Sequence, residues 1–131
     1  MTAATGATGA LAERYLRAVA AQDWPTVESC LAPGVRRFGP FGDDVVGRAP
    51  YLALLQRTMP SLPGYHLDID AVTEAGPGRV FVELRETVEV DGRPLLTHEC
   101  LVFDMAQGTV DQVAIYIRRD AGGGAGGQDV P

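Results

Sequence analysis

The hydrophobic periodicity of this chain changes once, near Gly64, and this change constrains the fold more than any other feature. Before that point apolar residues recur at helical spacing, and after it they alternate with polar residues at the period of two expected for strands. A chain whose helices precede its strands is typical of the α+β class, in which helices pack on an antiparallel sheet. We therefore predict a single α+β domain and no repeated β-α-β unit.

Capping and turn residues predict where the elements begin and end. Three helices are expected: one from Ala10, a second capped by Asp23 and ended by Pro33-Gly34, and a third over Arg48–Met59. A short strand and then four strands in meander order are expected: Val35–Phe38, Tyr65–Val72, Val80–Val90, Leu95–Asp104 and Val110–Arg118. Asp91-Gly92 predicts a tight hairpin. The domain should cover residues 10–119, between a disordered N-terminus (1–9) and a disordered, Gly-rich tail (120–131).

Composition excludes several classes of function. The 131 residues carry a net charge of −6, with 11 Arg and no Lys, which argues against binding to nucleic acid or to an anionic membrane surface. No apolar run approaches the roughly 18 residues of a membrane-spanning helix, and no signal peptide is recognisable. Cys30 and Cys100 lack the spacing of a metal site. We expect a soluble protein of the bacterial cytoplasm with two free thiols.

One strand carries an acid where an apolar residue belongs. Val80–Val90 alternates strictly, and one face reads Val80, Val82, Leu84, Glu86, Val88, Val90. Because side chains alternate across a strand, this face must point to the core, and a one-residue slip would expose its five apolar residues. Glu86 is therefore predicted to be paired, to line a wet cavity or to have a raised pKa, since a buried carboxylate is otherwise costly. A catalytic acid or base has the same properties, but so does a purely structural Glu–Arg pair.

The pattern of the next two strands does not decide which of their faces points to the core. Glu99 shares a face with Leu101 and Phe103, so it faces the helices if those two residues do. The last strand is apolar on both faces. One face holds Val110, Gln112, Ala114 and Tyr116, and the other holds Val113, Ile115 and Ile117.

His66, Asp68 and Asp70 lie on one strand face, at a spacing that could hold a divalent metal. A solvated strand face has the same pattern and is the interpretation we favour. We expect no metal and no cofactor.

Four segments carry a family resemblance when they are read in order. They are ERYLRAVAAQDWPTVESCLAPGVRRFGP, GRAPYLALL, VELRETVEVDG and LVFDMAQGTVDQVAIYI. The chain resembles the nuclear transport factor 2-like superfamily, in its SnoaL-like (polyketide-cyclase-like) and ketosteroid-isomerase-like branch, over about residues 10–118. The resemblance implies a cone-shaped, curved sheet around a pocket and, in many members, a homodimer. It also implies a range of activities: isomerisation, dehydration, cyclisation, epoxide hydrolysis or none.

The resemblance implies roles for individual residues. Tyr15 matches the first-helix tyrosine that donates to the substrate oxygen in ketosteroid isomerases, and Glu99 best matches their second, acidic donor. Gly39 occupies the place of their general base. Limonene-epoxide-hydrolase-like members carry an aspartate where this chain has Ile115, before Tyr116. The usual residues for steroid isomerisation and for epoxide hydrolysis are therefore incomplete.

The resemblance also implies which side chains face the pocket. Glu86, Glu99, Tyr15 and Arg37 are expected to be the catalytic residues. The ligand pocket is expected to contain Tyr116, Gln112, Tyr51, Leu55 and Phe103.

Three functions are compatible with these residues. The first is a cofactor-independent isomerase, cyclase or dehydratase that moves protons on a small apolar carbonyl or polyketide-like compound. The second is a non-catalytic module that binds a small ligand. The third is a dimerisation module that uses its outer sheet face, with Val113, Ile115 and Ile117 against the partner. In each case a homodimer through the outer face is expected, with no nucleic-acid or membrane partner.

Overall fold

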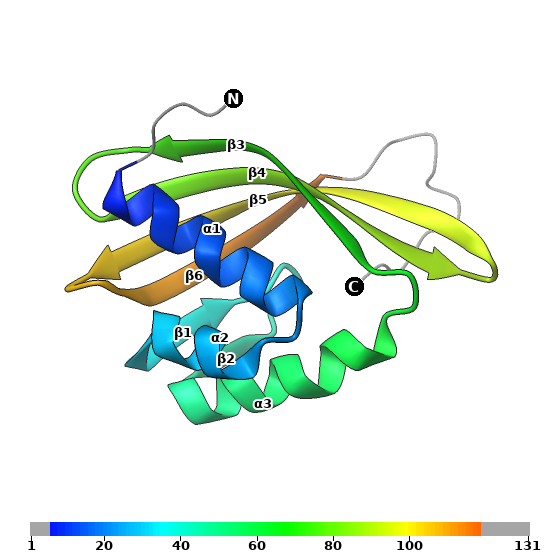
Figure 1. Cartoon of the computed structure of the whole chain (residues 1–131), viewed down its shortest axis with the longest axis horizontal. Coiled ribbons are helices and arrows are strands. Elements are labelled where there is room, and N and C mark those ends of the chain that lie inside the picture. The colour runs from blue at the N-terminus through cyan, green and yellow to red at the C-terminus, as the bar shows by residue number, and fades with distance from the viewer. Residues whose placement is uncertain (1–5, 119–131) are drawn as a thin grey trace.

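The computed structural model describes residues 6–118 and confirms the α+β class (Figure 1). The helices are α1 (Ala7–Ala20), α2 (Trp24–Cys30) and α3 (Arg48–Thr58), and a 3₁₀ turn, Met59–Ser61, follows α3. The strands are β1 (Leu31–Phe38), β2 (Asp44–Val46), β3 (His66–Glu74), β4 (Arg79–Val90), β5 (Arg93–Ala106) and β6 (Thr109–Arg118). The tail expected at 120–131 and residues 1–5 of the expected N-terminal segment lie outside the described residues.

The strands form one curved sheet in the order β2-β1-β6-β5-β4-β3. The strands from β3 to β6 form the antiparallel meander that the sequence predicts. β1 is parallel to β6, however, and β2, which was not predicted, pairs with β1. The sheet is therefore mixed, because the pairing of β1 with β6 departs from the antiparallel arrangement that was predicted. Figure 1 shows α1 lying across the sheet, with α2 and α3 grouped beside β1 and β2.

Two tight turns fix the register of the meander. Asp91 and Gly92 have φ angles of 53° and 77°, and Gln107 and Gly108 have φ angles of 56° and 80°. Two successive residues with positive φ are the requirement of the type I′ turn, whose twist matches that of paired strands. The hairpin predicted at Asp91-Gly92 is confirmed.

A bulge in β6 determines which of its residues face the helices. Asp104 pairs with Gln112, whereas the next residue, Met105, pairs with Val110, so Asp111 is an extra residue in β6. Val110 and Val113 consequently both point inward, and each is fully buried. The strict alternation assumed from the sequence fails at this point.

The start of β1 also differs from the prediction. α2 ends at Cys30 and not at Pro33-Gly34, and β1 begins at once with Leu31. Its pairing with β6 is irregular between Leu31 and Arg36. The dipeptide therefore lies in an irregular stretch of strand, where the missing proline N–H removes no regular ladder bond.

A carboxylate from β3 caps the first helix. The α1 N-terminus follows Gly6, which has no side chain to cap it. Glu74 Oε2 accepts hydrogen bonds from the Gly9 backbone N–H at 2.8 Å and from Thr8 Oγ1 at 3.0 Å. The bond from Gly9 satisfies a helix N–H group that lacks a partner within the helix, and the Thr8 hydroxyl adds a second bond to the same carboxylate. They also explain why α1 begins at Ala7, inside the segment expected to be disordered.

The core lies between α1 and the inner face of the sheet. Val80, Val82 and Leu84 of β4 are at most 2% exposed, and Phe103 of β5 is fully buried. No helix within residues 6–118 is long and apolar enough to cross a membrane.

We predict that Glu74→Gln destabilises the protein at neutral pH. The backbone hydrogen bond from Gly9 and the hydroxyl of Thr8 hold the pKa of Glu74 below its usual value, so the folded chain favours the ionised form. This stabilisation is present above the ordinary Glu pKa of 4.5 and is lost as the pH falls through the lower folded value. The melting temperature of Glu74→Gln should therefore be lower than that of the wild type at pH 7 and should converge with it at acidic pH, below the folded pKa of Glu74. Glu28→Gln, at an exposed position on α2, is the matched control and should change little at either pH.

Candidate functional site

Glu86 lies on the inner face of β4, directly after the three buried residues of that face. It is half-buried, and its cross-strand partner on β5 is Thr97. Leu84 pairs with Glu99 in the same ladder. Glu86 and Glu99 are therefore diagonal neighbours on one sheet face, close enough for long side chains to meet.

The two carboxyl groups share a proton. Burial, then a hydrogen bond to Glu86 and the negative charge of Glu86, raise the pKa of Glu99 to about 10. Glu99 is therefore protonated at neutral pH and donates to Glu86. Two carboxyl groups this close cannot both be ionised without a large cost in free energy, because their charges repel. The two pKa values of the pair are therefore driven apart.

A third residue, Tyr65, completes this group. Its hydroxyl donates to Glu86 Oε2 at 2.5 Å, and β3 brings it there because the neighbouring Leu67 pairs with Glu86. Burial, and then the charge of Glu86, raise the pKa of Tyr65 far above its ordinary value. Sequence reasoning missed Tyr65, although its alternation with Leu67 would have placed it on the inner face.

Two tyrosines from α1 and α3 form a second polar group. The hydroxyls of Tyr15 and Tyr51 share a hydrogen bond, and the two residues are 3% and 1% exposed. Burial raises the pKa of both, so both remain protonated, and the neighbouring Tyr51 raises that of Tyr15 further. Phe103 packs edge-on against Tyr15, with ring centroids 5.8 Å apart.

Arg37 of β1 supplies a positive charge. Its Nη1 donates to Asp43 Oδ2 at 3.0 Å and to the Asp43 carbonyl oxygen at 3.3 Å. Burial alone would raise the pKa of Asp43, but the hydrogen bonds from Arg37 and from the Phe41 backbone N–H outweigh it and hold this pKa below its usual value. The charge of Arg37 also lowers the pKa values of Tyr15 and Glu99, against the dominant effect of burial.

These groups line one cavity of about 260 Å³, which we call the inner cavity. Its polar lining is Tyr15, Tyr51, Tyr65, Arg37, Asp43, Thr58, Glu86 and Glu99. Its apolar lining includes Leu16, Leu55, Met59, Leu101, Ile115 and Ile117. An apolar wall with a few convergent polar groups is typical of a small-molecule site.

The structure brings together six of the nine residues that the sequence suggested. Glu86, Glu99, Tyr15, Arg37, Tyr51 and Leu55 all line the inner cavity. Phe103 is fully buried behind Tyr15 and supports the site without lining it.

Gln112 and Tyr116 lie on the opposite face of the sheet, so their expected place in the pocket is wrong. Gln112 donates to Asp104 at 3.2 Å, and Tyr116 is 61% exposed. The cause is the bulge at Asp111, which turns Ile115 and Ile117 toward the inner cavity. Val113, Ile115 and Ile117 were expected to meet a partner from the outer face, but all three lie on the inner face.

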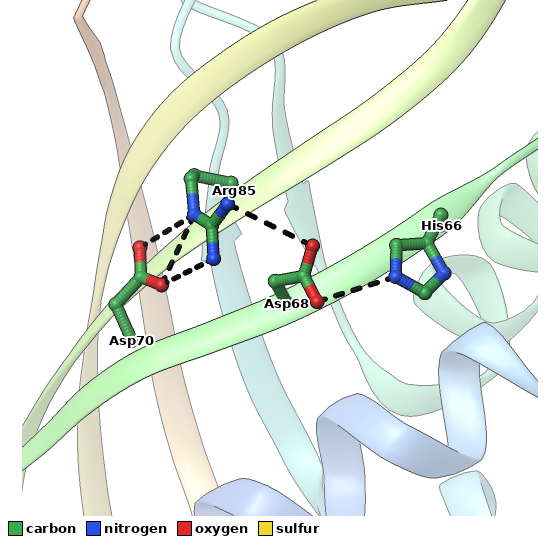
Figure 2. A network of polar contacts seen from close by, with 4 residues as sticks. All are labelled: His66, Asp68, Asp70 and Arg85. Atoms are coloured by element: carbon green, nitrogen blue, oxygen red, sulfur yellow. Dashed lines mark hydrogen bonds and ion pairs between the residues drawn. The ribbon is translucent and has the colours of Figure 1, made fainter.

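The acids of β3 that resembled a metal site are tied to Arg85 of β4 (Figure 2). Arg85 bonds to both oxygens of Asp70 at 2.8–3.0 Å and lies 3.9 Å from Asp68. Asp68 in turn lies 3.2 Å from His66 Nε2. The arrangement is an ion-pair network on an exposed strand face. Within residues 6–118 no group of three His, Cys, Asp or Glu is arranged to hold a metal ion.

Chemically, the inner cavity holds one proton on an acid pair and several hydrogen-bond donors in an apolar enclosure. A protonated carboxyl that donates a hydrogen bond to a second carboxyl supplies both an acid and a base. The hydroxyls of Tyr15 and Tyr51 and the guanidinium of Arg37 can bind an oxygen. This equipment suits proton transfer on a small ligand.

We predict that Glu99→Gln becomes increasingly stable relative to the wild type as the pH rises. An acid whose pKa is higher in the folded chain than in the unfolded chain lowers the free energy of unfolding as the pH rises from the unfolded pKa to the folded pKa. For Glu99 this interval runs from 4.5 to about 10. Glutamine keeps an N–H donor for Glu86 but does not titrate. Urea unfolding midpoints, measured across this interval, should fall more steeply with pH for the wild type than for Glu99→Gln. Parallel curves for the two proteins would contradict the assignment of the proton to Glu99.

Several solved structures have a fold similar to that of this chain. An epoxide hydrolase of Mycobacterium tuberculosis, similar to limonene epoxide hydrolase, has a TM-score of 0.75 at 20% identity, with 86% of this chain and 83% of that chain covered. A Kribbella flavida protein, provisionally assigned as a ketosteroid isomerase, has a TM-score of 0.77 at 22% identity, covering 95% and 90%. Bal32a, from a soil-derived mobile gene cassette, has a TM-score of 0.77 at 22% identity, covering 85% and 88%. At these identities the likeness establishes the fold alone.

No curated protein matches the sequence. The family model of the SnoaL-like domain matches residues 12–113, which is most of the chain and includes every residue that lines the inner cavity except Ile115 and Ile117. The chain therefore belongs to the SnoaL-like domain family, within the nuclear transport factor 2-like, ketosteroid-isomerase-like group of folds.

Proposed function

We propose that this protein is a cofactor-independent enzyme that transfers protons on a small, mostly apolar carbonyl compound, as an isomerase, cyclase or dehydratase. The observation that carries the proposal is the pair Glu86 and Glu99, which shares one proton on the wall of an apolar cavity. A pair with one proton and two different environments is the arrangement that general acid–base catalysis needs.

The reaction balances without a co-reactant. Glu86 accepts a proton from the carbon beside the carbonyl group, and the C–H electron pair forms the enolate. Glu99 then returns its own proton to the oxygen or to another carbon of the substrate. The pair ends with one proton, as it began, so neither an oxidant nor a metal is required by the balance.

The size of the cavity limits the substrate. A volume of about 260 Å³ is just below the roughly 300–1,000 Å³ typical of drug-sized ligands. The apolar wall favours a hydrocarbon body, and the donors favour one oxygen function. These features support a small cyclic or aromatic ketone, or a similar polyketide fragment.

We predict that Glu86→Gln abolishes proton exchange on such compounds. The assay is incubation with cyclohexanone, acetophenone and isophorone in D₂O, with deuterium uptake beside the carbonyl followed by NMR. Because general base catalysis contributes roughly 10²–10⁴-fold, the enzyme-dependent rate should fall by at least about 10²-fold in Glu86→Gln.

Glu83→Gln is the matched control for this assay. Glu83 is on the same strand but is exposed on the outer face, opposite Cys100. Its substitution should leave exchange unchanged. An unchanged rate in folded Glu86→Gln would refute the assignment of the base.

We also propose a homodimer through the outer face of the sheet. An outer patch combines the apolar side chains of Phe81, Val102, Ala114 and the exposed Tyr116 with Arg79, Cys100 and Gln112. These residues replace the ones first expected there, because the bulge turns Ile115 and Ile117 inward. The unpaired thiols of Cys30 and Cys100 support a reducing compartment such as the cytoplasm.

We predict that Tyr116→Glu makes the protein monomeric. A charge introduced into the outer patch must be desolvated when two copies associate, which costs several kcal/mol. Sedimentation equilibrium should give a dimer for the wild type and a monomer for Tyr116→Glu. Asp111→Asn, at the exposed bulge of the same strand, is the control and should remain dimeric. A monomeric wild type would exclude the proposal.

A further inference from the structure

Arg37 is the only Lys or Arg that lines the inner cavity within residues 6–118. Its side chain is only 15% exposed. A partly buried guanidinium beside an apolar wall is costly to maintain and needs a partner. Proton transfer between Glu86 and Glu99 leaves Arg37 without a step of its own.

Asp43 holds this guanidinium in place. Both hydrogen bonds between the two residues use Nη1, one to the carboxylate and one to the carbonyl oxygen. The other carboxylate oxygen, Oδ1, accepts from the Phe41 backbone N–H at 3.1 Å. Asp43 is thereby fixed on both sides, and it fixes Arg37 in turn.

Gly39 makes room for this carboxylate. A Cβ atom at residue 39 would lie 2.2–2.4 Å from the carboxyl atoms of Asp43, far inside van der Waals contact. The Gly39 backbone N–H also donates to the Asp43 carbonyl oxygen at 3.1 Å. The position of Asp43, and through it that of Arg37, therefore depends on the absence of a side chain at Gly39.

The remaining donors of Arg37 are open. Nε and Nη2 have no hydrogen-bond partner among the described residues, and no buried side-chain nitrogen or oxygen there lacks one. These N–H groups are consequently accessible, and Arg37 lines the inner cavity. β6 separates Arg37 on β1 from the acid pair on β4 and β5, and the apolar side chains of Ile115 and Ile117 line the cavity from β6.

We propose that Arg37, positioned by Asp43 and Gly39, is the oxyanion-binding group of the inner cavity. It binds the ligand oxygen on which negative charge develops, while the acid pair handles the proton. The substrate class narrows to compounds whose carbonyl oxygen becomes an enolate or phenolate oxygen. Fixed donors aimed at developing charge are the most effective form of such stabilisation. The catalytic use of this group rests on the proposed function, but oxyanion binding does not.

The test uses 4-nitrophenol, whose ionised form is yellow and which carries its charge on one oxygen. Titrated with the wild-type protein, bound nitrophenol should have a lower apparent pKa than free nitrophenol. In Arg37→Met this apparent pKa should rise by about 1 to 3, the effect of removing one neighbouring opposite charge. Arg37→Lys retains the charge and should keep the ionised form, with weaker binding, because the fork of donors is lost.

Variants of Asp43 test whether its carboxylate positions Arg37 or only stabilises the loop. Asp43→Asn keeps an oxygen acceptor for Arg37 and removes a negative charge, so bound nitrophenol should be ionised at least as fully as in the wild type. Asp43→Ala removes the acceptor, so the apparent pKa should rise toward that of Arg37→Met. Gly39→Ala should behave as Asp43→Ala, because its Cβ displaces the carboxylate.

Circular dichroism and melting temperature establish that each variant is folded. A purely structural ion pair would change the melting temperature of Asp43→Ala but not the ionisation of bound nitrophenol, and that result would overturn the proposal. Neutral binding or no binding by the wild type would overturn it as well. Glu86→Gln distinguishes the two proposals: it should lose proton exchange yet keep Arg37-dependent ionisation of nitrophenol.

Discussion

The register of β4 against β5 is the constraint on which the site depends. It sets Glu86 and Glu99 diagonally on the inner face, and the hairpin turn at Asp91-Gly92 fixes it. A slip of β4 by one residue would turn Glu86 outward together with Val80, Val82 and Leu84, and so away from Glu99 of β5. The burial of the core and the meeting of the two carboxyl groups therefore have one structural cause.

The fold and the position of Glu86 could be predicted because the pattern of β4 is unbroken, whereas Glu99 was placed on the inner face by the family resemblance. Alternation alone placed Glu86 on the core face, and the helices and the meander followed from periodicity and turns. The outward placement of Gln112 and Tyr116 could not be predicted, because both faces of β6 are apolar and the extra residue at Asp111 leaves no mark in the pattern. A bulge changes the face of every later residue without changing the composition of the strand.

Groups that reach the site from elsewhere in the chain were missed for a different reason. Tyr65 meets Glu86 only through the β3–β4 register, and Asp43 reaches Arg37 only because its loop folds back onto Gly39. In the position-by-position comparison with ketosteroid isomerases, Gly39 stands where those enzymes have the carboxylate of the general base. In the folded chain the carboxylate of Asp43 lies against Gly39. A carboxylate is therefore present at this place although residue 39 does not supply it.

The charge balance explains how an apolar cavity tolerates three carboxyl groups and one guanidinium. Asp43 is paired with Arg37, Glu99 keeps its proton, and Glu86 accepts hydrogen bonds from Tyr65 and Glu99. Retaining a proton avoids the cost of burying a second charge beside the first. The same retention leaves an acid and a base side by side. The proton that Glu99 retains thus both lowers the cost of burying the acid pair and provides the acid that proton transfer needs.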